Sequence, residues 1–479
     1  MSSSNVSFAH IIEREQGLRR TLTSRKLTMI AIGGAIGTGL FLGSGFAISL
    51  AGPSVLVSYV IGAVAAVLLM ACLAEMTVAH PTSGSFGAYA EHYVGPLAGF
   101  LVRWCYWTSV VLGVGIEVTA VAVYMKYWFP VPPGWLWILL FSVGLILANA
   151  LAVNVFGTVE YWFSLIKVTA IIAFIVLASY LLMGSPSSLP PASGFANYTA
   201  FGGFLPHGWW GTWVAVIIAV FSYFSIEIIA VAAGEAQQPE IAITRAFRST
   251  IVRLILFYLL TLGLMLAVMP WTAAGIDESP FVKVMRTSGI PAAAGVVNFV
   301  VLVAALSSMN SLMYVSTRMM FSLSRAGYAP RLFGALNSHG VPLPALLLSS
   351  TGIAVAAIVT VVSPQRAYIL MLSVGSFCML FVWMMIFITH YRFRRAWAHN
   401  ADLPPRFRAH GFPVTTLLGA GLMAAVLVTT LFSRPFRPTL AFGIPFVACM
   451  TAIYWIWYRG AHASARSGCD PDRSAPRDL

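Results

Sequence analysis

The sequence predicts an all-α integral membrane protein with about twelve transmembrane helices. Hydrophobic residues make up 59% of the 479 residues and charged residues only 9%, whereas about a quarter of the residues of a soluble domain are charged. Long windows contain no Asp, Glu, Lys or Arg, among them 27–74, 127–159 and 168–226. Because a helix needs about 20 apolar residues to cross a bilayer, several windows hold two spans. These continuous runs exclude a β-barrel, whose short strands alternate polar and apolar residues.

The individual spans are obtained by dividing the apolar runs at Pro, Gly, polar clusters and charges. In chain order the predicted spans are 28–49, 53–75, 97–125, 134–153, 158–182, 212–233, 249–270, 291–322, 343–362, 368–390, 412–432 and 438–458.

The distribution of Lys and Arg predicts the orientation. With a cytoplasmic N-terminus, 21 of the 28 Lys and Arg fall in inner segments and six in outer loops, and Lys167 lies within a span. This asymmetry predicts that the N-tail (1–26) and the C-tail (459–479) are both cytoplasmic. The net charge of +13 is spread over loops that flank the membrane, so we expect contact with the anionic lipid leaflet and no nucleic-acid partner.

The first span contains the glycine-rich stretch GGAIGTGLF at 33–41. Gly tolerates backbone conformations that other residues resist, so a helix unwinds easily here. An unwound point exposes amides that suit a carboxylate and carbonyls that suit an ammonium group, the two halves of an amino-acid zwitterion. Close helix packing through GxxxG spacing is the alternative explanation of the same glycines.

An inverted repeat would place a second interrupted helix in the sixth span. This span reads VFSYFSIEIIAVAAGE at 220–235, with Ser222, Tyr223, Ser225 and Glu227 at mid-membrane depth. Its polar residues favour a break, although it lacks a central glycine.

Several motifs resemble the bacterial amino acid permeases of the amino acid, polyamine and organocation superfamily, in particular the branch of the γ-aminobutyrate, lysine and aromatic permeases. The motifs, in order along the chain, are GGAIGTGLFLGSG, LAEMTVAHPTSGSFGAYAEHYVGP, VEYWFSLIKVTAII, GEAQQPEIAITRAFRSTIVR and STRMMFSLSRAGYAP. The resemblance implies five-plus-five inverted repeats within a transport core, broken helices 1 and 6, two extra helices and usually proton symport. The boundaries are 27–390 for the core, 27–183 and 205–390 for the repeats, and 391–458 for the last two helices with a cytoplasmic linker.

We therefore expect a proton-coupled amino acid importer of the cytoplasmic membrane. The expected substrate-binding residues are Ile36, Gly37, Thr38, Gly39, Phe221, Ser222, Phe224 and Ser225. The amides around Thr38 would hold the substrate carboxylate, and carbonyls near Ile36 and Phe221 would meet its amine. Ser225 stands where the family commonly has a glycine, which narrows the pocket and favours a small neutral amino acid.

Three charged residues lie well inside predicted spans, where ionisable groups are candidates for function. Lys167 matches a family lysine beside the broken first helix, so it is a candidate for carrying the coupled proton, or for a static bond to backbone carbonyls. Glu227 is a candidate for binding the substrate amine, gating or accepting a proton, or for a structural bond. Glu117 is a candidate for coupling, or for hydrogen bonding within the bundle.

Other classes of function remain as alternatives. A sodium-coupled transporter or an exchanger would share this fold, and a non-transporting sensor would share the site. No HExxH, Walker loop or CxxC spacing occurs, so we expect no enzyme, no metal and no cofactor.

Overall fold

The computed structural model describes residues 8, 11, 34–82, 84–151, 153–183, 194–232, 239–287, 292–337, 340–398 and 408–458. The predicted tails 1–26 and 459–479, apart from Phe8 and Ile11, lie outside these residues, as does Gly33. Throughout the described part, helices are joined by turns and loops, without a strand. The structure is therefore all-α, as predicted.

The long helices coincide with the predicted spans. They are α4 (Val55–Ala79), α6 (Pro96–Met125), α7 (Gly134–Leu151), α8 (Val153–Met183), α11 (Pro239–Val268), α13 (Ala293–Arg325), α16 (Ala367–Ala398), α17 (Val414–Phe432) and α18 (Arg437–Ile453). The ninth predicted span is divided between α14 (Leu343–Ser349) and α15 (Thr351–Val362). Ten of the described helical stretches are long and apolar enough to cross a membrane.

Two predicted spans are interrupted helices. The first continues after its break as a π-helical turn, Gly39–Gly43, and then as α3 (Ser44–Ala51). The sixth consists of α9 (Gly208–Tyr223) and the short α10 (Ile228–Ala232), separated by four residues in turns.

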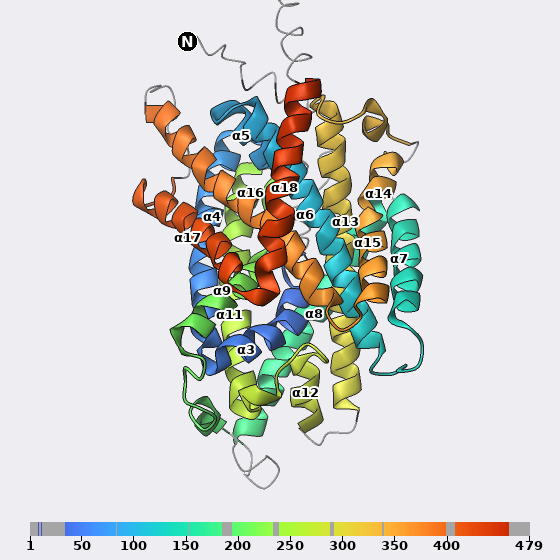
Figure 1. Cartoon of the computed structure of the whole chain (residues 1–479), viewed down its shortest axis with the longest axis vertical. Helices are drawn as coiled ribbons and strands as arrows, with labels where there is room; N and C mark the ends of the chain where they lie inside the picture. The colour runs from blue at the N-terminus through green and yellow to red at the C-terminus, as the bar shows by residue number, and fades with distance from the viewer. Residues whose placement is uncertain are drawn as a thin grey trace, which may run out of the picture.

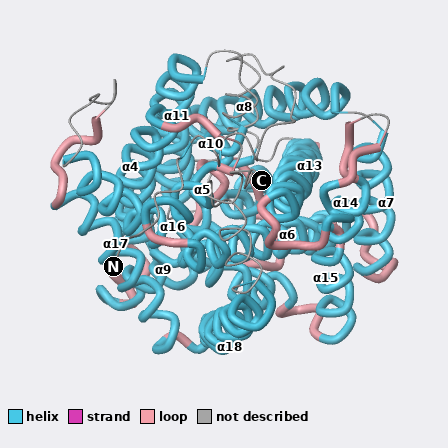
Figure 2. The backbone as a smooth tube through the Cα atoms, turned by 90° about the horizontal axis from the view of Figure 1, so that it is seen from above, coloured by secondary structure: helices cyan, strands magenta, loops and turns pink. Residues whose placement is uncertain are grey.

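Helices α6, α13 and α16 form the centre of the bundle, since α6 packs against both of the others. On another side, α4 packs against α9 and α11. Helices α7, α14 and α15 lie at one edge and α18 at another when the bundle is seen from above (Figure 2). The interrupted helices thus lie among packed neighbours, where their unpaired backbone groups are shielded from lipid.

Two short helices that the sequence did not predict lie at opposite ends of the bundle (Figure 1). They are α5 (Ser85–Tyr93) and α12 (Pro280–Thr287). At the α5 end, Arg103 donates to Glu91 over 2.6 Å, and Arg394 donates to Glu75 over 2.8 Å. These ion pairs join helix ends and lie away from both breaks.

Candidate functional site

The backbone of the first interrupted helix turns at Ile36 and Gly37. The Ile36 carbonyl accepts a hydrogen bond from Lys167 Nζ at 2.9 Å. The Thr38 amide donates to both carboxylate oxygens of Glu117, at 3.3 and 3.2 Å. Side chains therefore satisfy backbone groups that the break has removed from the helix, as burial in a membrane requires.

The second break follows Tyr223, where α9 ends. Ser225 has a φ of 75°, a left-handed conformation that is costly for residues other than glycine. Its amide donates to Glu227 Oε1 at 3.1 Å, a bond that holds the turn. The helix therefore breaks although the central glycine is missing.

Tyr258 of α11 connects the two breaks. Its hydroxyl lies 2.9 Å from the Ala35 carbonyl and 2.8 Å from the Ser222 carbonyl. A single hydroxyl proton serves both acceptors, one on each interrupted helix. Tyr258 is fully buried, so water does not replace this bond.

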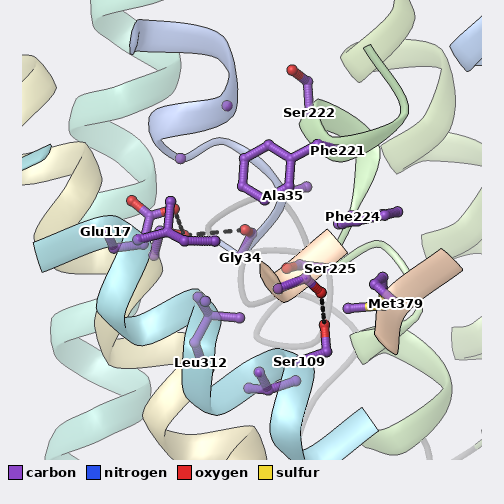
Figure 3. Close-up of a pocket in the computed structure, with 17 residues that line it drawn as sticks. Gly34, Ala35, Ser109, Glu117, Phe221, Ser222, Phe224, Ser225, Leu312 and Met379 are labelled. Carbon is purple, nitrogen blue, oxygen red and sulfur yellow. Dashed lines mark hydrogen bonds between the residues drawn. The ribbon is translucent and has the colours of Figure 1, made fainter. Parts of the chain in front are cut away.

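The gap between the breaks holds a small cavity of about 40 Å³, enough for a few water molecules. Figure 3 shows Glu117, Phe221 and Ser225 directed toward it from different helices. Of the predicted substrate-binding residues, those that line it are Gly37, Gly39, Phe221, Ser222, Phe224 and Ser225. Ile36 and Thr38 do not line the cavity, and they contribute through the backbone bonds described above.

Glu117 of α6 is the charged residue that lines the cavity. Besides Thr38, it accepts a hydrogen bond from Ser308 Oγ of α13 at 3.0 Å. A protein carboxylate therefore already occupies the amide that the sequence assigned to the carboxylate of a ligand. The amide at this helix break is therefore paired with a carboxyl group of the protein itself.

Lys167 and Glu227 are fully buried and lie outside the cavity lining. The Lys167 ammonium group interacts electrostatically with Glu160 and Glu117. Glu227 accepts hydrogen bonds from Tyr106 at 3.2 Å and Trp383 at 3.3 Å, in addition to the Ser225 amide. These three hydrogen bonds hold the Glu227 side chain against the turn of the second break.

Tyr368 of α16 is a site residue that the sequence analysis missed. Its hydroxyl donates to the Thr38 carbonyl at 3.1 Å, and it also lines a second cavity together with Lys126 and Asp277. Tyr368 and Tyr258 belong to apolar spans in which no periodicity distinguishes them from core residues, so no sequence signal identified them.

The polar residues in the middle of α13 divide between two environments. Ser308 faces the cavity, whereas Ser307 and Asn310 donate to Glu160. Within the part of the chain that the structure describes, no group of three or more His, Cys, Asp or Glu could hold a metal ion.

The fold and the site together define a polytopic membrane permease, in which two interrupted helices enclose a small cavity. The chain belongs to the amino acid permease family, whose model matches residues 26–464. The members of this family transport amino acids and are not enzymes.

Similar proteins cover nearly the whole chain. The chain is 36% identical to the γ-aminobutyric acid permease of Bacillus subtilis over 98% of its own length and 99% of the relative's. It is 38% identical to the amino-acid permease RocC of the same organism, over 91% of its own length and 94% of the relative's. It is 36% identical to the aromatic amino acid transport protein AroP of Escherichia coli, over 94% and 97%. The family assignment therefore applies to the entire transport core.

Proposed function

We propose that this chain is a proton/amino acid symporter that imports amino acids across the cytoplasmic membrane by alternating access. The observation that carries the proposal is the pair of helix breaks around one cavity, with Glu117 on the Thr38 amide and Lys167 on the Ile36 carbonyl. The first break thus bonds both a carboxyl group and an amino group, the two kinds of group that an amino-acid zwitterion carries.

In this proposal the substrate carboxylate takes the place of Glu117 on the amides around Gly37, Thr38 and Gly39. The amine meets the carbonyls near Ile36 and Phe221, as half-helix ends bind charged groups in other transporters. The side chains of Ser222, Phe224 and Ser225 contact the remainder of the substrate. The presence of Ser225 in the lining favours a small neutral amino acid.

Lys167 is the residue proposed to carry the coupled proton. Its protonated form favours the loaded state, and loss of the proton accompanies release inside. Glu117 links this proton to the substrate, because its carboxylate contacts the same helix break and interacts with the same ammonium group. Glu227 is proposed to gate the second break through its bond to Ser225. Moving one charge through the membrane field supplies about 2.3 kcal/mol per 100 mV.

The proposed architecture has twelve spans, with inverted repeats at 27–183 and 205–390 and two further helices at 391–458. Both termini are proposed to be cytoplasmic, because Lys and Arg are concentrated in the segments on that side.

The test is sodium-free uptake of labelled alanine into proteoliposomes under an inward proton gradient, with other amino acids and γ-aminobutyrate as unlabelled competitors. We expect the native protein to accumulate alanine and Lys167→Ala to lose accumulation while retaining exchange against internal alanine. Lys126→Ala, which alters an exposed lysine at the end of α6, is the matched control and should accumulate normally.

Unchanged accumulation by Lys167→Ala would refute the coupling role. Dependence of uptake on sodium would indicate a sodium-coupled transporter instead of a proton symporter. Uptake only against internal amino acid would indicate an exchanger. Substrate binding without any flux would identify a sensor.

A further inference from the structure

Glu160 is a buried carboxylate of α8 that the proposed transport mechanism leaves without a role. Its side chain is fully buried. It accepts hydrogen bonds from Ser307 at 2.6 Å, Ser164 at 3.3 Å and Asn310 at 3.4 Å. These donors favour the ionised form of the carboxylate, whereas its burial opposes ionisation.

A buried negative charge also requires a positive partner. Lys167 follows Glu160 by seven residues on the same helix, which places the two on one face, about 10.5 Å apart along the axis. Long side chains can span part of this separation, and the two charges interact electrostatically. Among the described side chains, Lys167 is the charged group that interacts electrostatically with Glu160.

The neutral groups around Glu160 come from its neighbouring helices. Ser307, Asn310 and Ser311 belong to α13, and Asn149 of α7 donates to Asn310 at 2.8 Å. The groups that bond Glu160 directly are therefore neutral, and its charged partner among the described side chains is Lys167.

Consecutive residues of α13 connect the two carboxylates that interact with Lys167. Ser307 donates to Glu160 at 2.6 Å, and Ser308 donates to Glu117 at 3.0 Å. The ammonium group thus interacts with one acid on the cavity side and one acid outside the cavity lining. Glu117 changes partner when a ligand takes the Thr38 amide, whereas Glu160 has no contact with the cavity.

We propose that Glu160 is a positioning residue that keeps Lys167 protonated when Glu117 is engaged elsewhere, and thereby sets the pH range of proton-coupled transport. This inference rests on the proposed function, because it assigns Glu160 to the same coupling group. Glu160 neither binds the substrate nor releases the coupled proton.

The experiment measures initial uptake rates in proteoliposomes across a pH series, at a constant proton gradient. Removing the negative charge with Glu160→Gln makes protonated Lys167 less favourable, so the pH at half-maximal rate should move toward acid. We expect a displacement of up to about one pH unit, because larger displacements require an opposite charge within about 4–6 Å. Glu160→Asp retains the charge and should restore most of the native profile.

Ser307→Ala provides a second variant in case Glu160→Gln fails to fold. It removes one donor from the ionised carboxylate, so the acid displacement should have the same direction and a smaller size. Ser316→Ala is the matched control, because Ser316 is a buried serine of α13 that bonds the local Met313 carbonyl at 3.0 Å. This control should keep the native profile.

A native pH profile in folded Glu160→Gln, or in Ser307→Ala if the first variant is unstable, overturns the inference and leaves the proposed function intact. Loss of protein stability without displacement of the profile has the same meaning, because a structural role changes only the amount of protein. If uptake by the native protein does not depend on the proton gradient, the proposed function and this inference are both refuted.

Discussion

Replacing Tyr258 by Phe tests whether the bond between the two helix breaks is needed for substrate binding. The substitution keeps the ring and removes a hydroxyl that lies 2.9 Å from the Ala35 carbonyl and 2.8 Å from the Ser222 carbonyl. Leaving a buried acceptor without its donor costs about 1–3 kcal/mol. Because 1.4 kcal/mol is a factor of ten, the bound state should weaken by roughly five-fold to 150-fold.

The assay is equilibrium binding of labelled substrate to purified protein, together with uptake kinetics. We expect the Kd and KM of Tyr258→Phe to rise and the unfolding temperature to fall, because the carbonyls left without a donor also destabilise the folded protein. Tyr198→Phe is the matched control, since its hydroxyl bonds the Gly263 carbonyl of the same helix at 2.6 Å, away from the cavity. A Kd within two-fold of native for Tyr258→Phe would refute the bridging role.

Two further predictions concern packing and pH. A Cβ at Gly39 would lie 2.9 Å from the backbone Cα of Ser222, so Gly39→Ala should destabilise the protein by about 1–3 kcal/mol through overpacking and abolish uptake. Gly421→Ala is the control, because the space around Gly421 is open, and this variant should retain uptake. Equal uptake by both variants would contradict the close approach of Gly39 to Ser222. His80, at the end of α4, has its pKa lowered from 6.5 to about 4 by burial and then by the charge of His92. The unfolded chain therefore takes up this proton first, and stability falls as pH drops from 6.5 to about 4. In thermal unfolding of detergent-solubilised protein, His80→Asn should show a smaller fall across that interval, and parallel curves would contradict the assignment.

The sequence predicts the long helices well because a bilayer requires continuous apolar runs, which are visible in a single chain. Helices α5 and α12 were missed because they are short and lie at the ends of the bundle, outside those runs.

The two breaks differ in how far the sequence predicts them. Glycines mark the first break, since Gly adopts unwound conformations at low cost. The second depends on Ser225 in a conformation that glycine normally adopts, held by the neighbouring Glu227. Such a contact between side chain and backbone has no signature in hydrophobic periodicity.

The residues that satisfy the breaks depend on the three-dimensional arrangement. Tyr258 and Tyr368 reach the first interrupted helix from α11 and α16, more than two hundred residues away in the chain. Glu160 stands near the beginning of the predicted span 158–182, where an exposed position is expected, whereas the structure buries it completely.

The bond between Glu117 and the Thr38 amide has a consequence for the kinetics of turnover. A membrane carrier must return empty after it releases its cargo, and bare amides in the bilayer would raise the barrier to that step. Here a side chain of the protein, Glu117, can pair with the Thr38 amide after the cargo leaves. We therefore infer that the empty transporter returns quickly to its outward-facing state. Net import should then predominate over one-for-one exchange. Comparing net efflux with counterflow measures this directly, and counterflow that far exceeds net efflux would contradict it.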